Sequence, residues 1–140
     1  MQSIPVGATG QFILHVREEH LASRFKDSML PPVLATPVMI LAMENAALNA
    51  IKPFLEPGTT AVGSRIDVVH LLPTPVGRDV QARARVTKVD GKHLEFTVSA
   101  ADGDEEIGRG SHERVVIDVA KFITRLQEKF GPGAASARAT

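Results

Sequence analysis

A long and almost uninterrupted apolar run, Thr36–Ile51, constrains the fold of this chain more than any other segment. Its one charged residue is Glu44. Apolar side chains would cover most of the circumference of a helix here, so the run predicts a helix that is buried on most sides. Thr36 is a candidate N-cap, and Pro37 suits the first helical position. The helix is expected to end at about Lys52, because a proline follows it.

Glu44 is the leading candidate for chemistry. A carboxylate inside an apolar helix loses its hydration, which is costly unless the group is paired or protonated. A perturbed acid in such a place is typical of an active site, where it would act as a general base or a nucleophile. The alternative is a structural ion pair or a solvated face, with Asn45 and Asn49 marking a narrow polar seam.

Alternation of apolar and polar residues predicts five strands and one more helix. Asp90-Gly91 is the strongest short hairpin signal in the chain. Helical spacing of apolar residues predicts a last helix over Val119–Phe130. The predicted strands cover residues 11–17, 61–72, 80–89, 94–100 and 107–118.

One apolar helix and a single antiparallel sheet predict an α+β fold in which the sheet wraps around the helix. Residues 1–130 are expected to form one domain, and residues 131–140 a disordered tail rich in Ala, Ser and Arg. A lone sheet leaves an edge and a face that need cover, so a homodimer or a higher oligomer is expected.

Composition excludes several function classes. Of 140 residues, 16 are Lys or Arg and 16 are Asp or Glu, and the chain has no Trp or Tyr. It therefore lacks the basic surface and the aromatic platforms of a nucleic-acid-binding protein. The absence of cysteine excludes disulfides and thiolate catalysis. No secretory signal is visible and the longest apolar stretch is too short to span a bilayer, so a cytoplasmic location and no membrane partner are expected.

Two further residues are candidates beside Glu44. His70 ends an apolar strand, where a histidine is usually a satisfied core residue, although beside a carboxylate it would form an acid–base pair. Thr36 is explained by capping alone. Thr36 and Glu44 would lie about 12 Å apart along one helix. If both serve one site, they line different parts of it, or one comes from a partner subunit.

One segment matches a metal-binding motif only in part. His112-Glu113-Arg114 begins like the zinc-protease motif, but valine replaces its second histidine and the segment is predicted to be a strand. No phosphate-binding loop or dinucleotide fingerprint exists, and no metal or other cofactor is expected.

Several segments together resemble one known family, the hot-dog-fold acyl-CoA thioesterases, and in particular its fluoroacetyl-CoA thioesterase branch. The similarity extends over nearly everything from residue 33 to residue 130, and residues 104–117 are its most specific part. The segments that carry it are residues 33–36, 43–44, 54–58, 62–70, 74–77 and 98–117.

The resemblance implies a hot-dog fold, with a long helix wrapped by an antiparallel sheet and a dimer whose active sites lie at the subunit interface. It implies that Thr36, Glu44 and His70 are catalytic. It also implies that Gly63 lies near the thioester carbonyl and that Arg114 contacts the substrate. Coenzyme A would enter as part of the substrate.

One segment departs from the family pattern. The fluoroacetyl-specific enzyme has phenylalanines in the segment that covers the acyl pocket, whereas residues 27–32 here contain no aromatic residue. The expected activity is therefore hydrolysis of a small acyl-CoA, with Glu44 either attacking the carbonyl or activating water. A hot-dog acyl-CoA hydratase or dehydratase and a non-catalytic acyl-CoA-binding protein are the alternatives.

Overall fold

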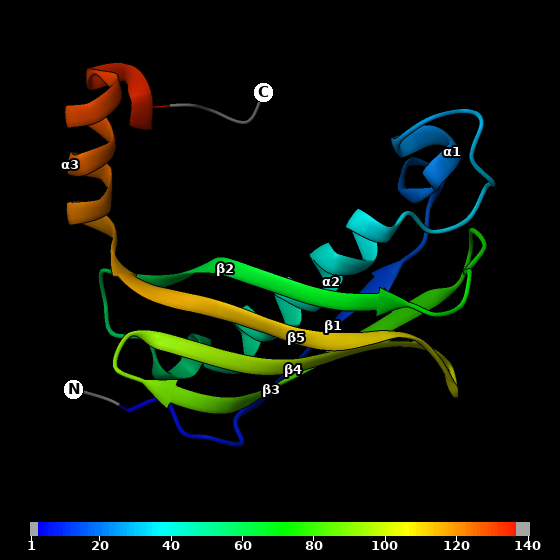
Figure 1. The fold of residues 1–140 in the computed structure, drawn as a ribbon, viewed down its shortest axis with the longest axis horizontal. Helices are drawn as coiled ribbons and strands as arrows, with labels where there is room; N and C mark the ends of the chain where they lie inside the picture. Colours follow the sequence, from blue (N-terminus) through cyan, green and yellow to red (C-terminus); the bar gives the residue numbers. More distant parts are fainter. Residues whose placement is uncertain (1–2, 137–140) are drawn as a thin grey trace.

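A long helix, α2 (Thr36–Ile51), lies in the concave side of a curled five-stranded antiparallel sheet (Figure 1). This computed structural model describes residues 3–136. The strand order is β1-β3-β4-β5-β2, so β1 and β2 form the two edges. The strands are β1 (Thr9–His15), β2 (Thr59–His70), β3 (Asp79–Asp90), β4 (His93–Asp102) and β5 (Glu105–Asp118).

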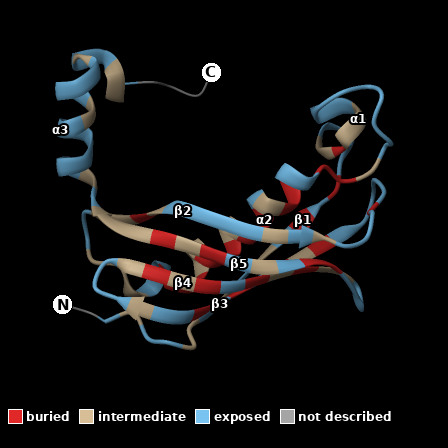
Figure 2. Cartoon of the chain, viewed as in Figure 1, coloured by how far each residue is buried: buried red, intermediate tan, exposed pale blue. Residues whose placement is uncertain are grey.

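The core lies between α2 and the inner face of the sheet, where the buried residues gather (Figure 2). Small residues of α2, among them Ala46 and Ala50, are fully or almost fully buried. They let β1 approach closely, because Gly10 sits directly against the backbone of Ala46 and Ala50 with no space for a side chain. The apolar run therefore forms the predicted helix, although Leu41 on its outer side is 49% exposed.

The strand alternation confirms the predicted sheet. Val80, Ala82, Ala84 and Val86 are all buried, while the residues between them face outward. The β3–β4 hairpin turns at the predicted place, with Gly91 at φ 60°. β3, β4 and β5 begin or end one or two residues beyond their predicted bounds, since cross-strand hydrogen bonds continue beyond the alternating segments. β1 and β2 begin two residues earlier than predicted and also end two residues earlier, at His15 and His70.

The expected cap at Thr36 is wrong. The N-cap of α2 is Ala35, no side chain caps this end, and Thr36 is the first helical residue. The hydroxyl of Thr36 is used elsewhere, in a hydrogen bond to His70.

The last helix, α3 (Val119–Phe130), has the predicted bounds and stands away from the sheet (Figure 1). Asp118 caps it by accepting a hydrogen bond from the backbone N–H of Lys121 at 3.0 Å. None of its residues is buried. Pro132–Ala135 then form the short 3-10 helix η3, so part of the expected tail has regular backbone, and residues 137–140 lie outside the described range.

Short helices make the remaining connections: η1 (Glu18–His20) and α1 (Ala22–Phe25) before α2, and η2 (Lys52–Phe54) after it. Within residues 3–136 the structure contains no helix with the length and apolarity that crossing a bilayer requires.

Candidate active site

Glu44 lies on the side of α2 that faces β2. Its carboxylate is half-buried, and its Oε2 would lie only 2.9 Å from a Cβ atom added to Gly63. The carboxylate therefore packs against a bare backbone, and any larger residue at position 63 would collide with it. In the part of the chain that the structure describes, Glu44 makes no hydrogen bond or salt bridge.

The backbone of β2 is irregular at this point. The register with β5 shifts between Gly63 and Arg65, which leaves Ser64 out of the pairing. A β-bulge of this kind interrupts the ladder and frees backbone groups. The candidate carboxylate thus lies beside a disrupted stretch of edge strand.

Arg114 of β5 lies opposite Gly63 in the pairing of β5 with β2. Its side chain is buried, and its Nε and Nη2 both donate to the Ala61 carbonyl, at 3.1 Å and 2.6 Å. Its Nη1 lies 3.8 Å from the Cβ position at Gly63. Burial lowers the pKa of Arg114, and the nearby negative charge of Glu44 opposes that shift. Arg114 therefore supplies a positive charge close to Glu44 from inside the protein.

His112 completes this group and was missed by sequence reasoning. Its ring is 1% exposed, and Nδ1 donates to the Arg65 carbonyl at 2.7 Å. Arg114 Nη1 donates to its other nitrogen, Nε2, at 3.1 Å. The sequence feature that would have indicated His112 is its position two residues before Arg114, on the inward-facing side of β5. The incomplete zinc-protease motif is not that feature.

Thr36 and His70 form a second group, at the N-terminal end of α2. The Thr36 hydroxyl and His70 Nδ1 are 2.8 Å apart and share a hydrogen bond. Burial lowers the pKa of His70, with a smaller opposing effect from a backbone hydrogen bond at Leu72. The lowered pKa favours the neutral ring near pH 7, and its Nε2 is buried with no hydrogen-bond partner among the described residues.

The structure brings the five predicted site residues into two groups. Thr36 contacts His70, and Glu44 lies with Gly63 and Arg114. Along α2, Thr36 and Glu44 are separated by about 12 Å. Along β2, His70 and Gly63 are separated by roughly 20 Å. The described chain therefore holds these residues in two separate groups rather than in a single cluster.

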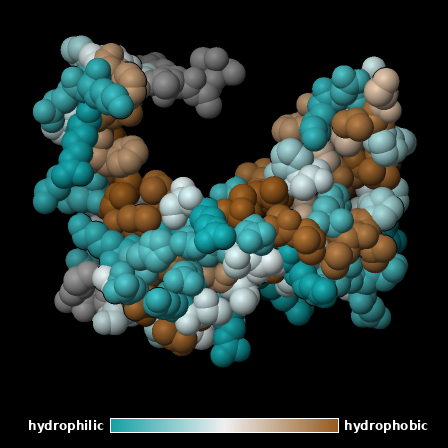
Figure 3. Space-filling model, in the orientation of Figure 1, coloured by the Kyte–Doolittle hydropathy of each residue, from teal (hydrophilic) through white to brown (hydrophobic). Residues whose placement is uncertain are grey.

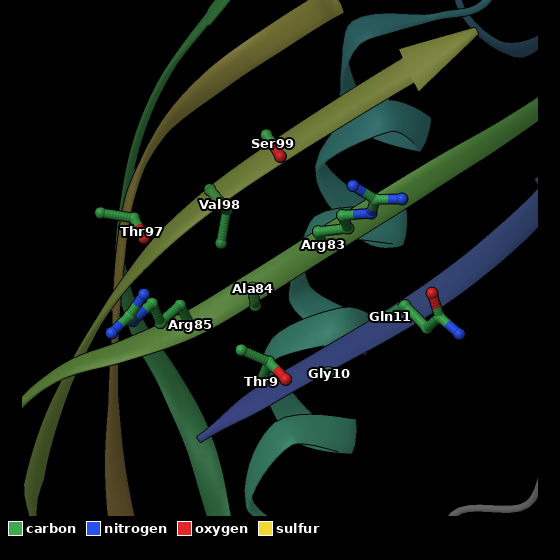
Figure 4. Close-up of a pocket in the computed structure, with 9 residues that line it drawn as sticks. All are labelled: Thr9, Gly10, Gln11, Arg83, Ala84, Arg85, Thr97, Val98 and Ser99. Atoms are coloured by element: carbon green, nitrogen blue, oxygen red, sulfur yellow. The ribbon is translucent and has the colours of Figure 1, made fainter. Parts of the chain in front are cut away.

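A spacious groove lies elsewhere, on the outer face of the sheet over β1, β3 and β4 (Figure 4). It measures about 610 Å³, and polar side chains such as Arg83, Arg85 and Ser99 line it. Arg83 donates to Gln81 at 2.9 Å. None of the candidate catalytic residues lines this groove.

The described residues contain no cluster of three or more His, Cys, Asp and Glu side chains placed to hold a metal ion.

Comparison with known proteins decides the family. The model of the fluoroacetyl-CoA-specific thioesterase family matches residues 16–120. The chain belongs to this family. The match confirms the resemblance seen in the sequence and identifies the chain as a thioester hydrolase.

Individual relatives agree with this assignment. The fluoroacetyl-CoA thioesterase of Streptantibioticus cattleyicolor is 43% identical over 103 residues, which cover 74% of each chain. A solved structure of the fluoroacetyl-CoA thioesterase FlK superposes with a TM-score of 0.84 at 35% identity, covering 91% of this chain and 98% of that one.

Two more distant structures support the hot-dog fold. A thioesterase superfamily member from Thermus thermophilus is 33% identical with a TM-score of 0.83, covering 93% of this chain and 98% of its own. A hot-dog-like protein from Thermanaerovibrio acidaminovorans is 26% identical with a TM-score of 0.82, covering 91% and 94%. The predicted α+β hot-dog fold is therefore confirmed.

Proposed function

We propose that this thioesterase is a cytoplasmic homodimer that hydrolyses a small acyl-CoA thioester to the free acid and coenzyme A. The observation that carries the proposal is the Glu44 carboxylate, half-buried against the bare backbone of Gly63. It makes no hydrogen bond or salt bridge among residues 3–136, so both oxygens remain available to water or to substrate. No metal or other cofactor takes part.

Glu44 drives the first step. Either it removes a proton from water as the water oxygen attacks the thioester carbonyl, or its own oxygen attacks and the resulting anhydride is then hydrolysed. Both routes pass through a tetrahedral species with a negative oxygen. Cleavage of the carbon–sulfur bond then releases the coenzyme A thiolate, which takes up a proton.

The bulge in β2 supplies a donor for the developing negative oxygen. Ser64 is out of register with β5, and Gly63 adds no side chain that would keep a ligand from the backbone. A free backbone N–H at or near Gly63 would therefore stabilise the oxyanion.

Thr36 and His70 serve the second half of the reaction. Because burial lowers the pKa of His70, the ring is neutral in the resting enzyme and is able to exchange a proton near pH 7. Its hydrogen bond with Thr36 orients the ring. The pair positions the acyl group and moves a proton toward the leaving thiolate.

A second copy brings the two groups together. β2 is an edge strand of 12 residues with one side unpaired in the sheet, which is a template for pairing with another strand. Apolar side chains are exposed on β2 itself, at Val69, and also on α2, at Leu41, and on α3, at Phe122. Figure 3 shows apolar residues on the side of α3 that faces the hollow above the sheet. A partner's β2 would cover these side chains and set its His70 against this chain's Glu44.

The acyl group is small. Solved structures of the related FlK enzyme include complexes with acetyl-CoA and with fluoroacetate and coenzyme A. Residues 27–32 contain no aromatic side chain, and Met29 within them is 90% exposed. We therefore expect short acyl-CoA substrates without strong selection for fluorine.

A thiol-release screen tests the proposal. The purified protein is assayed with short, branched, aromatic and halogenated acyl-CoAs, and hydration of crotonyl-CoA is measured beside it. Release of free coenzyme A from a short acyl-CoA supports the proposal. Hydration without thiol release, or binding without turnover, would reject it.

A further inference from the structure

His112 is a buried titratable residue to which the proposed reaction gives no role. It is 1% exposed and stacks on Phe96, with ring centroids 5.7 Å apart and planes at 29°. Both ring nitrogens are used, one toward β2 and one toward Arg114. A histidine needed only to fill space would not require two directed hydrogen bonds.

The partners of the ring determine its tautomer. A carbonyl oxygen accepts only, so Nδ1 must carry the proton that it donates to Arg65. A guanidinium donates only, so Nε2 must be the unprotonated acceptor for Arg114 Nη1. His112 is therefore a neutral acceptor aimed at one particular nitrogen of Arg114.

That nitrogen and the Glu44 carboxylate both lie against the Cβ position at Gly63. The Cβ position at Gly63 lies 2.9 Å from Glu44 Oε2 and 3.8 Å from Arg114 Nη1. The Glu44 carboxylate and the Arg114 guanidinium both lie against Gly63, yet they form no salt bridge within 4.0 Å among the described residues. Arg114 is anchored instead at three points, twice to Ala61 and once to His112.

We propose that His112 is a positioning residue that holds Arg114 back from Glu44. By accepting from Nη1, it keeps the guanidinium as a nearby counter-charge and leaves both carboxylate oxygens free. This inference rests on the proposed role of Glu44.

Without the acceptor, Nη1 becomes an unsatisfied buried donor, which is costly. The nearest anion available to it is Glu44. Arg114 would then close onto the carboxylate, and a carboxylate in a direct ion pair is a weaker base and a blocked nucleophile.

Burial lowers the pKa of His112, so the ring remains a neutral acceptor at the working pH. The charged groups that face it are Arg114 and Glu113 of its own strand and Glu44 of α2. Arg114 disfavours its protonation, whereas the two carboxylates favour it.

Two variants at one position provide the test. His112→Gln has a side-chain oxygen able to accept from Arg114, whereas His112→Phe keeps a ring on Phe96 but has no acceptor. The Gln amide N–H is also able to donate to the Arg65 carbonyl, whereas Phe has no donor, so the position of Arg114 in each variant, and not stability alone, separates the two hydrogen bonds. We expect kcat of His112→Phe to be up to about 100-fold lower than that of His112→Gln. The acid limb of its profile, which is the fall of kcat toward low pH, should also move to lower pH.

A control separates positioning from stability. Phe96→Leu removes the ring contact and leaves the His112 hydrogen bonds, so it should lower the melting temperature without moving the acid limb. Equal kcat and equal pH profiles for His112→Gln and His112→Phe would overturn the inference.

A crystal structure of His112→Phe gives a readout that does not depend on activity. An Arg114–Glu44 salt bridge supports the inference, and an unmoved guanidinium refutes it. Full activity of Glu44→Gln would instead refute the proposed function, whatever Arg114 does.

Discussion

Glu44 and Gly63 meet so closely that a single added carbon would separate them, since a Cβ at position 63 would lie 2.9 Å from Glu44 Oε2. One residue lies in a helix and the other in an edge strand, and the absence of a side chain in the strand creates the space for the carboxylate. We therefore propose that the absence of a side chain at Gly63 matters to the site as the acid itself does.

Gly63→Ala should therefore impair catalysis more than folding. The new methyl group displaces the carboxylate from the bulge, and a displacement of about 1 Å can cost roughly 100-fold in rate. Steady-state thiol release measures kcat, and thermal unfolding measures stability. Gly133→Ala is a matched control, because a methyl group there meets no atom within 4 Å. A Gly63→Ala enzyme with the kcat of the parent would contradict the proposed position of Glu44.

Glu44→Gln should abolish most turnover and spare binding. The amide keeps the size of the side chain but is neither a base nor a nucleophile, so we expect kcat to fall by roughly 10²- to 10⁴-fold. Isothermal titration with coenzyme A should give an affinity close to that of the parent. In the parent, one turnover in heavy-oxygen water decides the route. Label in the Glu44 carboxylate indicates an anhydride, and label in the released acid alone indicates direct attack by water.

The two groups of site residues predict complementation between inactive chains. If His70 of one protomer works with Glu44 of the other, a heterodimer of Glu44→Gln and His70→Ala chains contains one intact site. Coexpression with two different tags allows this heterodimer to be purified. We expect about half of the parent activity per dimer, whereas each homodimeric variant is nearly inactive. If the heterodimer is as inactive as the two variant homodimers, each site takes all its catalytic groups from one protomer.

The free energy of unfolding should fall as the pH drops below 6.5. Burial lowers the folded-state pKa of both His70 and His112 from the ordinary value of 6.5. Between the folded and unfolded pKa values the unfolded chain binds more protons, so stability rises with pH in that window and levels off above it. Urea unfolding at a series of pH values measures the slope. His112→Gln should reduce it, and an unchanged slope in that variant would show that His112 does not contribute.

Local sequence patterns account for much of this structure. The helix over Thr36–Ile51, the inward alternation in β3 and the turn at Gly91 follow from residues close in sequence. The isolation of one acid in that helix also predicts from the sequence alone that Glu44 is a candidate catalytic residue. Periodicity suffices for such features because the backbone repeat alone sets which side chains share a face.

The partners of the site residues were decided by the tertiary structure. Thr36 was expected to cap its helix, but its hydroxyl meets His70, which is 34 residues away in sequence. The sequence places His112 only in an incomplete metal motif, whereas the register of β5 against β2 places it between Arg65 and Arg114. Contacts of this kind depend on strand register and on how a helix lies across a sheet, and no local repeat encodes either.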